Sequence, residues 1–342
     1  MTLLIARGQL IGCGNVGIDA LSDVLKTVRL SGAIFYDVTG KAPWAAEQPQ
    51  QSEILPLILP GAEHLIAYHV VVDGRCYANL VGQEPILVEA GEVIVITNGE
   101  PHVVSSSPGL RAAPSTGSAA AAAAAGQLPC FVTYGGEGPS VRLVCGFLAC
   151  DARPFNPLLE NLPPVIKAGR PGGQDDGWLS LFARQVMREA ESKRSGSDGV
   201  IARLSELMFI EVIRQYLEGL PKEQIGWLAG LRDPFVGRAL SLLHASPASS
   251  WTVEELARQT GLSRSVLAER FANLIGCPPM QYLAKWRMQI AWSLLLAGAT
   301  NIATIAAETG YGSEAAFSRA FKKLVGTSPS IWRKQQERLK SS

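Results

Sequence analysis

Closely spaced cysteine pairs and long apolar runs are both missing from this 342-residue sequence. Its six cysteines form no C-x-x-C pair, which argues against a zinc ribbon or a thioredoxin-type redox motif. No stretch of about 18 uninterrupted apolar residues occurs, so the sequence predicts no transmembrane helix and no membrane partner. Arg7 and Gly8 interrupt the apolar start and no signal-peptide cleavage site follows, so we expect a cytoplasmic protein.

Charge is scarce and unevenly distributed. Charged residues make up 18% of the chain, and the formal net charge is only +1. From Arg232 to the end, 14 Lys and Arg stand against 7 Asp and Glu, whereas the first 231 residues carry 17 and 23. A basic C-terminal module on an acidic body suggests that only this end of the protein meets a polyanion.

Short β-branched runs bounded by Gly, Pro, Asn or Asp fill residues 32–150, after an amphipathic helix predicted over 19–31. Such runs are typical of an all-β sandwich or barrel. Within them, residues 105–127 are rich in Gly, Ser, Pro and Ala, and we expect a long loop there.

Residues 154–177 are rich in Pro and Gly and are interpreted as a linker. Helical patterns follow over 178–192 and 200–217. A helical hairpin with an apolar face can pack against a second copy of the chain or against its own β-domain. The sequence leaves both arrangements open.

The last third of the chain contains a helix-turn-helix pattern over residues 252–276. Thr252 and Glu255 fit a capping box, in which each side chain binds the other residue's backbone N–H. Gly261 suits the left-handed position that ends the first helix, and Ser263 caps the second. A helix, a short turn with glycine and a second helix form the unit that places its second helix in the major groove.

Residues 301–326 repeat this pattern, with Asn301 and Ser313 as caps and Gly310 at the end of the first helix. The helix predicted between the units, about 280–296, spans roughly 25 Å at 1.5 Å per residue. It could therefore set two recognition helices about one DNA turn apart. Helices are predicted in this region over 234–245, 253–260, 264–275, 279–297, 302–309, 314–325 and 329–338.

Residues 233–336 resemble the DNA-binding domain of the AraC/XylS family of transcriptional regulators, most clearly in A-x-E-T-G-Y-G-S-E-A-A-F-S-R-A-F-K-K-L-V-G-T-S-P-S-I-W-R. The resemblance implies that the N-terminal half of each second helix reads bases. Lys322 is expected to contact phosphate. The matching base-reading positions are Arg264, Ser265, Ala268 and Glu269 in the first unit, and Glu314, Ala315, Ser318 and Arg319 in the second.

Among these positions, Arg264 and Arg319 are the leading base readers because arginine can bind guanine through two hydrogen bonds. Either arginine could instead contact only phosphate, as most protein–DNA hydrogen bonds do. Ala268 and Ala315 offer only apolar contact, for instance to a thymine methyl group. Glu269 could accept a hydrogen bond from cytosine or pair with a neighbouring arginine.

Residues 19–165 resemble the cupin-type sensor domain that precedes AraC-type domains, in Y-H-V-V-V-D-G-R-C and E-A-G-E-V-I-V-I-T-N-G-E-P-H. His69 and His102 match metal-ligand positions of cupins, but Val71 stands where a further ligand is expected. Because catalytic metal sites need about three protein ligands, contacts to an organic effector or a purely structural role are favoured. The candidate ligands for a metal or small molecule are His69, His102, His64 and Cys76.

Two alternatives remain open. One is a redox sensor that uses two of the cysteines at 76, 130, 145 and 150, although Cys145 and Cys150 would face opposite sides of one strand. The other is an NAD-linked oxidoreductase, because residues 12–17 read G-C-G-N-V-G and Asp37 follows about 20 residues later. Against it, no further βαβ units follow.

The sequence therefore predicts an α+β multidomain protein that is a DNA-binding transcriptional regulator and not an enzyme. It implies a homodimer with promoter DNA as partner, with RNA polymerase as a further partner if it is an activator. No cofactor is certain beyond a small-molecule or metal effector. The expected parts are an N-terminal extension (1–18), a cupin-like β-barrel sensor (19–165), a helical linker or dimerisation region (166–230) and an all-α double helix-turn-helix domain (233–336).

Overall fold

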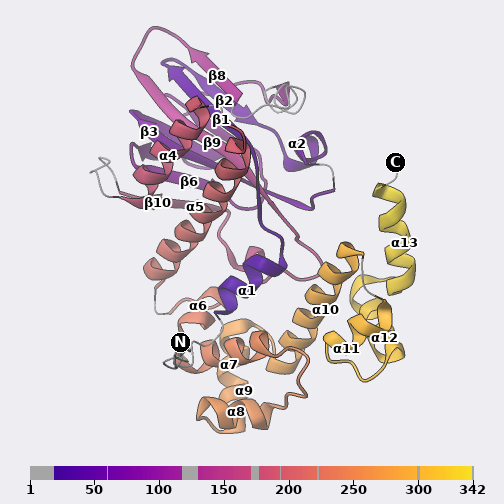
Figure 1. The fold of residues 1–342 in the computed structure, drawn as a ribbon. Coiled ribbons are helices and arrows are strands. Elements are labelled where there is room, and N and C mark those ends of the chain that lie inside the picture. Colours follow the sequence, from indigo (N-terminus) through magenta and orange to yellow (C-terminus); the bar gives the residue numbers. More distant parts are fainter. Residues whose placement is uncertain are drawn as a thin grey trace, which may run out of the picture.

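The computed structural model describes residues 19–59, 61–117, 130–170, 177–192, 194–221, 223–298 and 301–340. The G-x-G-x-x-G motif, Cys13 and the alanine-rich part of the expected loop lie outside these residues. A β-rich part and a helical C-terminal part lie one above the other in Figure 1, with helix α1 (Ala20–Thr27) between them. Across the described ranges, no helix is long and apolar enough to cross a membrane.

Two facing sheets form the β-rich part. The larger has the strand order β10-β6-β3-β9-β1-β8, and the smaller has the order β2-β7-β4-β5. β8 pairs in parallel with β1, and the other pairs are antiparallel. A closed barrel stays a prediction. The strands are β1 Ser31–Lys41, β2 Ala45–Gln48, β3 His64–Asp73, β4 Arg75–Leu80, β5 Ile86–Glu89, β6 Glu92–Ile96, β7 His102–Ser105, β8 Cys130–Gly135, β9 Ser140–Cys150 and β10 Val165–Gly169.

Strand β3 shows why the central strands of the larger sheet are apolar on both sides. Successive side chains point to opposite faces of a strand. Leu65, Ala67 and Val71 lie in the core between the sheets, while Ile66, Tyr68 and Val70 lie in the core under the helices. Because both faces are buried, the run is nearly continuous in apolar residues instead of alternating.

Helices α4 (Trp178–Ser192) and α5 (Ser197–Gly219) cover the outer face of the larger sheet. The Tyr68 hydroxyl lies 2.7 Å from Ser205 Oγ and ties β3 to α5. The hairpin therefore packs on its own β-domain, one of the two arrangements left open by the sequence. The linker expected over 154–177 is wrong in part, because β10 pairs with β6 and completes the larger sheet.

The C-terminal helices begin and end within two residues of the predicted bounds. The Thr252 hydroxyl accepts from the Glu255 N–H as expected, but the Glu255 carboxylate binds Arg258 and Gln259, so only half of the predicted capping box forms. Short helices α2 (Gln51–Ile58) and α6 (Trp227–Arg232) were not anticipated. The others are α7 Pro234–Ala245, α8 Val253–Thr260, α9 Arg264–Ile275, α10 Pro279–Ala297, α11 Ile302–Glu308, α12 Glu314–Val325 and α13 Pro329–Lys340.

The two helix-turn-helix units differ in what supports them. The first unit shares one continuous apolar core with α1, α4, α5 and the outer face of the larger sheet. The second unit has a separate core, built by the end of α10 with α11, α12 and α13 around Trp292, Phe317 and Phe321. Helix α10 contributes to both cores. It therefore joins the first unit, which packs against the β-rich part, to the second unit, which has a separate core.

Candidate DNA interface and sensor cavity

Helices α9 and α12 present matching exposed faces. Ser263 and Ser313 cap them by accepting from the N–H three residues later. Each helix turns two apolar side chains into its core, Leu267 with Phe271 and Phe317 with Phe321. The predicted DNA-contacting positions are exposed or half-buried: Arg264, Ser265, Ala268 and Glu269 on α9 and Glu314, Ala315, Ser318 and Arg319 on α12 as base readers, and Lys322 on α12 as a phosphate contact.

Aligning the two caps shows that each exposed face carries one arginine and one glutamate in opposite order. Arg264 matches Glu314, and Glu269 matches Arg319. Arg264 is already paired: its Nε lies 2.8 Å from Glu254 Oε1 on α8, although both side chains are more than half exposed. Arg264 therefore has a carboxylate partner on the preceding helix of its own unit.

Arg287 on α10 fixes the two units relative to each other. Its Nε donates to the Pro247 carbonyl over 2.7 Å and its Nη2 to the Ser249 carbonyl over 2.8 Å, both in the loop before α8. Its guanidinium also lies 5.8 Å from the centre of the Tyr311 ring in the second unit. One side chain thus contacts the turn regions of both units.

A cavity of about 380 Å³ lies between the two sheets. Two aromatic pairs form part of its wall: Trp44 stacks on Tyr134 with ring centres 5.9 Å apart, and Phe147 meets Tyr36 edge to face at 6.2 Å. Such a mainly apolar, concave space of a few hundred Å³ suits a small organic molecule.

His69 on β3 and His102 on β7 meet across this cavity. Their Nε2 atoms are 2.9 Å apart, and both residues line the space. Burial lowers the pKa of His102 to about 4, and burial together with neighbouring His102 lowers the pKa of His69 well below its usual range. Both imidazoles are therefore neutral at physiological pH.

The other two predicted ligands lie elsewhere. His64 is five residues from His69, so it faces the opposite side of β3, where its Nε2 donates to the Thr97 carbonyl over 2.6 Å. Cys76 lies in the inter-sheet core but does not line the cavity. In the described part of the chain, no group of three or more His, Cys, Asp and Glu residues could hold a metal ion.

The stretch Arg111–Ser115 crosses the cavity edge. Arg111 donates two hydrogen bonds to the buried Glu47 carboxylate, one of them 2.6 Å long. These bonds lower the pKa of Glu47. Ala112, Ala113 and Ser115 line the cavity beside this ion pair, so the pair holds part of the wall in place.

The loop after β9 connects the sensor to the DNA-binding part. The Phe155 N–H donates to Gln289 Oε1 on α10 over 3.0 Å, and the Phe155 ring meets Tyr282 edge to face at 5.6 Å. Further along, Asn161 Oδ1 accepts from the Trp227 N–H at the start of α6. The loop therefore docks on α6 and on the joining helix α10.

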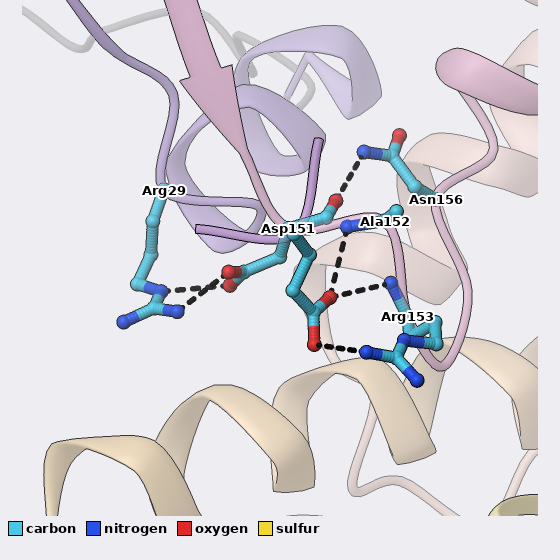
Figure 2. Close-up of polar contacts among 6 residues, drawn as sticks. Arg29, Asp151, Ala152, Arg153 and Asn156 are labelled. Carbon is cyan, nitrogen blue, oxygen red and sulfur yellow. Dashed lines mark hydrogen bonds and ion pairs between the residues drawn. The ribbon is translucent and has the colours of Figure 1, made fainter. Parts of the chain in front are cut away.

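Polar contacts fix the root of this loop, as Figure 2 shows. Arg29 binds the Asp151 carboxylate through two nitrogens, and Asn156 Nδ2 donates to the Asp151 carbonyl. Glu63 accepts from the backbone N–H groups of Ala152 and Arg153. β9, which carries the cavity residue Cys145, thus leads through a fixed corner to α10.

Comparisons with known proteins agree with this two-part arrangement. A cupin family profile matches residues 19–218, and a helix-turn-helix domain profile matches residues 256–335. A putative AraC-like transcription regulator from Streptomyces antibioticus is 34% identical over 92% of this chain and 98% of its own length. The chain belongs to the AraC-like transcriptional regulators.

Other relatives have the same character. The HTH-type transcriptional regulator AlkR of Acinetobacter baylyi is 27% identical over 93% of this chain and 99% of its own length. The crystal structure of the AdpA DNA-binding domain in complex with a target DNA is 27% identical, covers 30% of this chain and 92% of that chain, and gives a TM-score of 0.29.

The structure gives little support to the two alternative functions, an NAD-linked oxidoreductase and a redox sensor. Asp37, the acidic residue of the dinucleotide fingerprint, is bound by Arg142 at 2.7 Å. Cys145 and Cys150 lie in different cores, as their spacing predicts. Burial raises the pKa of Cys76 to about 12 and that of Cys145 well above its usual value, so few thiolates are available for disulfide exchange.

Most of the cavity wall of this regulator was missed from the sequence. Tyr36 on β1 and Phe147 on β9 lie far apart in the chain and stand in ordinary strand patterns. Strand alternation could have assigned each to a face, but only the pairing of strands shows which faces enclose the same space. The docking pair Phe155 and Gln289 likewise carries no local signal.

Proposed function

We propose that this AraC-like regulator binds promoter DNA through the exposed faces of α9 and α12, with Arg264 and Arg319 reading bases and Lys322 contacting phosphate. The observation that carries the proposal is the matched geometry of the two helices, with equivalent caps, equivalent buried pairs and one arginine on each exposed face. Arginine on a major-groove helix can bind guanine O6 and N7 together.

The test uses the full-length chain. The first unit shares its core with the sensor, so a fragment beginning near residue 233 would expose apolar surface that α1 and α5 cover. Random duplex DNA is selected on the full chain, and binding to the enriched sequence and to a scrambled one is measured against salt. We expect preferential binding whose logarithm falls linearly with log salt concentration. Equal binding to both sequences would contradict the proposal.

We also propose that the protein is a homodimer through the exposed face of α5. Val200 and Leu207 lie two helical turns apart and are 41% and 52% exposed. Apolar side chains at this spacing form one row on a helix. Sedimentation velocity should show Leu207→Glu shifting the protein toward monomer, whereas Ile225→Glu, at a more exposed apolar residue away from α5, should leave the dimer intact.

The cavity is the proposed effector site, and the loop after β9 is the proposed route to DNA. A ligand changes DNA binding only if it binds one arrangement of the domains better than another. β9 lines the cavity and leads to the Phe155–Gln289 contact. A ligand that shifts β9 would therefore change how the loop after β9 packs against α10. Location in the cytoplasm and contact with RNA polymerase stay predictions.

A further inference from the structure

The groups that line the cavity between the sheets limit which ligands can bind there. This inference rests on the cavity being the effector site of the proposed function. Its titratable groups leave no net charge inside. His69 and His102 are neutral, the Cys145 thiol is protonated, and Glu47 is neutralised by Arg111 at the edge. An ionised ligand would lose its hydration without gaining an unpaired counter-charge, which is a large cost.

The hydrogen bonds of the histidine pair define which nitrogen carries each proton. His102 Nδ1 lies 3.2 Å from the Glu100 carbonyl, which can only accept, so His102 Nδ1 is protonated. In a neutral imidazole His102 Nε2 is then an acceptor, and His69 Nε2, 2.9 Å away, must donate to it. His69 is neutral as well, so its Nδ1 carries a lone pair and no proton.

Two buried polar atoms, in residues that line the cavity, have no partner among the described residues. His69 Nδ1 and the Tyr36 hydroxyl are both buried and make no hydrogen bond there. Buried polar groups in proteins are almost always satisfied, so each orphan calls for an explanation. The first is an acceptor, and the second can donate or accept.

The strand register places these two orphans on one wall. Tyr36 on β1 pairs with Cys145 on β9, and Cys145 pairs with His69 on β3. All three residues line the cavity. With neighbouring strands about 4.8 Å apart, Tyr36 and His69 flank Cys145 with backbones about 10 Å apart. Both side chains therefore lie on the same face of the larger sheet, toward one cavity.

We infer that the cavity binds an uncharged, mainly apolar molecule with a hydroxyl group, such as a phenol or an alcohol. The ligand hydroxyl donates its hydrogen to His69 Nδ1. The oxygen of the same ligand hydroxyl accepts a hydrogen bond from the Tyr36 hydroxyl. The aromatic walls formed by Trp44, Tyr134 and Phe147 contact the apolar body. A carboxylate lacks the donor that His69 needs, and an ammonium group would be desolvated without an unpaired anion.

The test uses four naphthyl compounds with the same ring and different polar groups: 2-naphthol, naphthalene, 2-naphthoate and 2-naphthylmethylammonium. Calorimetric titration of the full-length chain at neutral pH should show 2-naphthol binding at least about tenfold more tightly than either ion, because a buried unpaired charge costs more than 1.4 kcal/mol. Equal or tighter binding of 2-naphthoate would overturn the inference, and so would the absence of binding by all four compounds at millimolar concentration.

Tyr36→Phe separates the hydrogen bond from packing. Its hydroxyl has no partner in the described chain, so the variant should fold with unchanged or higher stability. It should weaken 2-naphthol about tenfold and leave naphthalene unchanged. Tyr77→Phe, on the outer face of β4, is the matched control and should change neither. Equal affinity of 2-naphthol for Tyr36→Phe and the parent protein would contradict the assigned contact.

The outcome is independent of DNA binding, because these titrations contain no DNA. A chain that selects a DNA sequence but binds none of the naphthyl compounds contradicts only the ligand assignment. A chain that binds 2-naphthol as expected but shows no DNA preference contradicts only the proposed DNA interface.

Discussion

The backbone N–H of Phe155 donates to Oε1 of Gln289 over 3.0 Å, and both residues are buried. Phe155 belongs to the loop that leaves the sensor, and Gln289 to the helix that joins the two helix-turn-helix units. This bond therefore connects the cupin-like part to the helix that joins the two helix-turn-helix units. Several expected outcomes depend on such contacts between parts.

Gln289→Met should destabilise the full-length chain by about 1–3 kcal/mol, because it leaves the buried Phe155 N–H without an acceptor while roughly keeping the side-chain volume. Urea denaturation measures the change. Gln281→Met, at an exposed position on the same helix, should have little effect. Equal stabilities of the two variants would mean that the Phe155–Gln289 bond contributes nothing to docking.

Glu254→Gln should strengthen DNA binding about two- to fivefold, because it releases Arg264 from an exposed ion pair of modest energy. Fluorescence anisotropy with the selected DNA measures the change. Glu308→Gln, an exposed glutamate on α11, controls for the lost negative charge. In an Arg264→Ala background the gain from Glu254→Gln should fall to that of the control. An undiminished gain would show that Arg264 is not involved.

Arg319→Ala should relax sequence preference at one base pair, at a cost of about 1–3 kcal/mol for the preferred base. Lys322→Ala, one turn along the same helix, should weaken all sequences alike and reduce the salt slope by about 1. Binding to a set of single-base variants of the selected DNA distinguishes the two patterns. A uniform loss with Arg319→Ala would reassign that residue to phosphate contact.

Arg287→Lys should weaken binding to the full DNA site even though the charge is kept. Lysine cannot reproduce the two carbonyl contacts of the guanidinium and its position over Tyr311. We expect a loss of about tenfold, since two charge-assisted hydrogen bonds are affected. The same variant should bind DNA carrying only one unit's half of the site as the parent does. Full rescue by lysine would show that charge alone matters.

His244→Gln should reduce the pH dependence of stability below about pH 6.5 by the share of one histidine, while His69 and His102 keep theirs. His244 Nε2 lies 2.8 Å from the Tyr282 hydroxyl, and burial lowers the pKa of His244 to about 3. Between these pH values the unfolded chain binds a proton that the folded chain excludes, so the free energy of unfolding falls by about 1.4 kcal/mol per pH unit as pH drops. Glutamine can still form a hydrogen bond with the Tyr282 hydroxyl, but it has no group that takes up a proton in this pH range. An unchanged slope between pH 6 and 4.5 would contradict the neutral, buried His244.

The sequence by itself determined the elements whose signals are local. The caps Ser263 and Ser313, the glycines after the first helix of each unit and the apolar spacing of α9 and α12 act within a few residues, so helix bounds and exposed faces followed from them. The same holds for the opposite orientation of Cys145 and Cys150, which strand geometry fixes.

Tertiary structure alone decided the rest. His64 and His69 were both candidate ligands: strand alternation already sends His64 to the other face, but only the tertiary arrangement of the strands brings His69 against His102. The Arg264–Glu254 pair joins residues 10 positions apart, and the Phe155–Gln289 hydrogen bond joins residues 134 positions apart. The Tyr36 hydroxyl has no partner among the described residues, which also depends on side chains from distant parts of the chain. Contacts of this kind follow from the packing of complete elements, which no local pattern encodes.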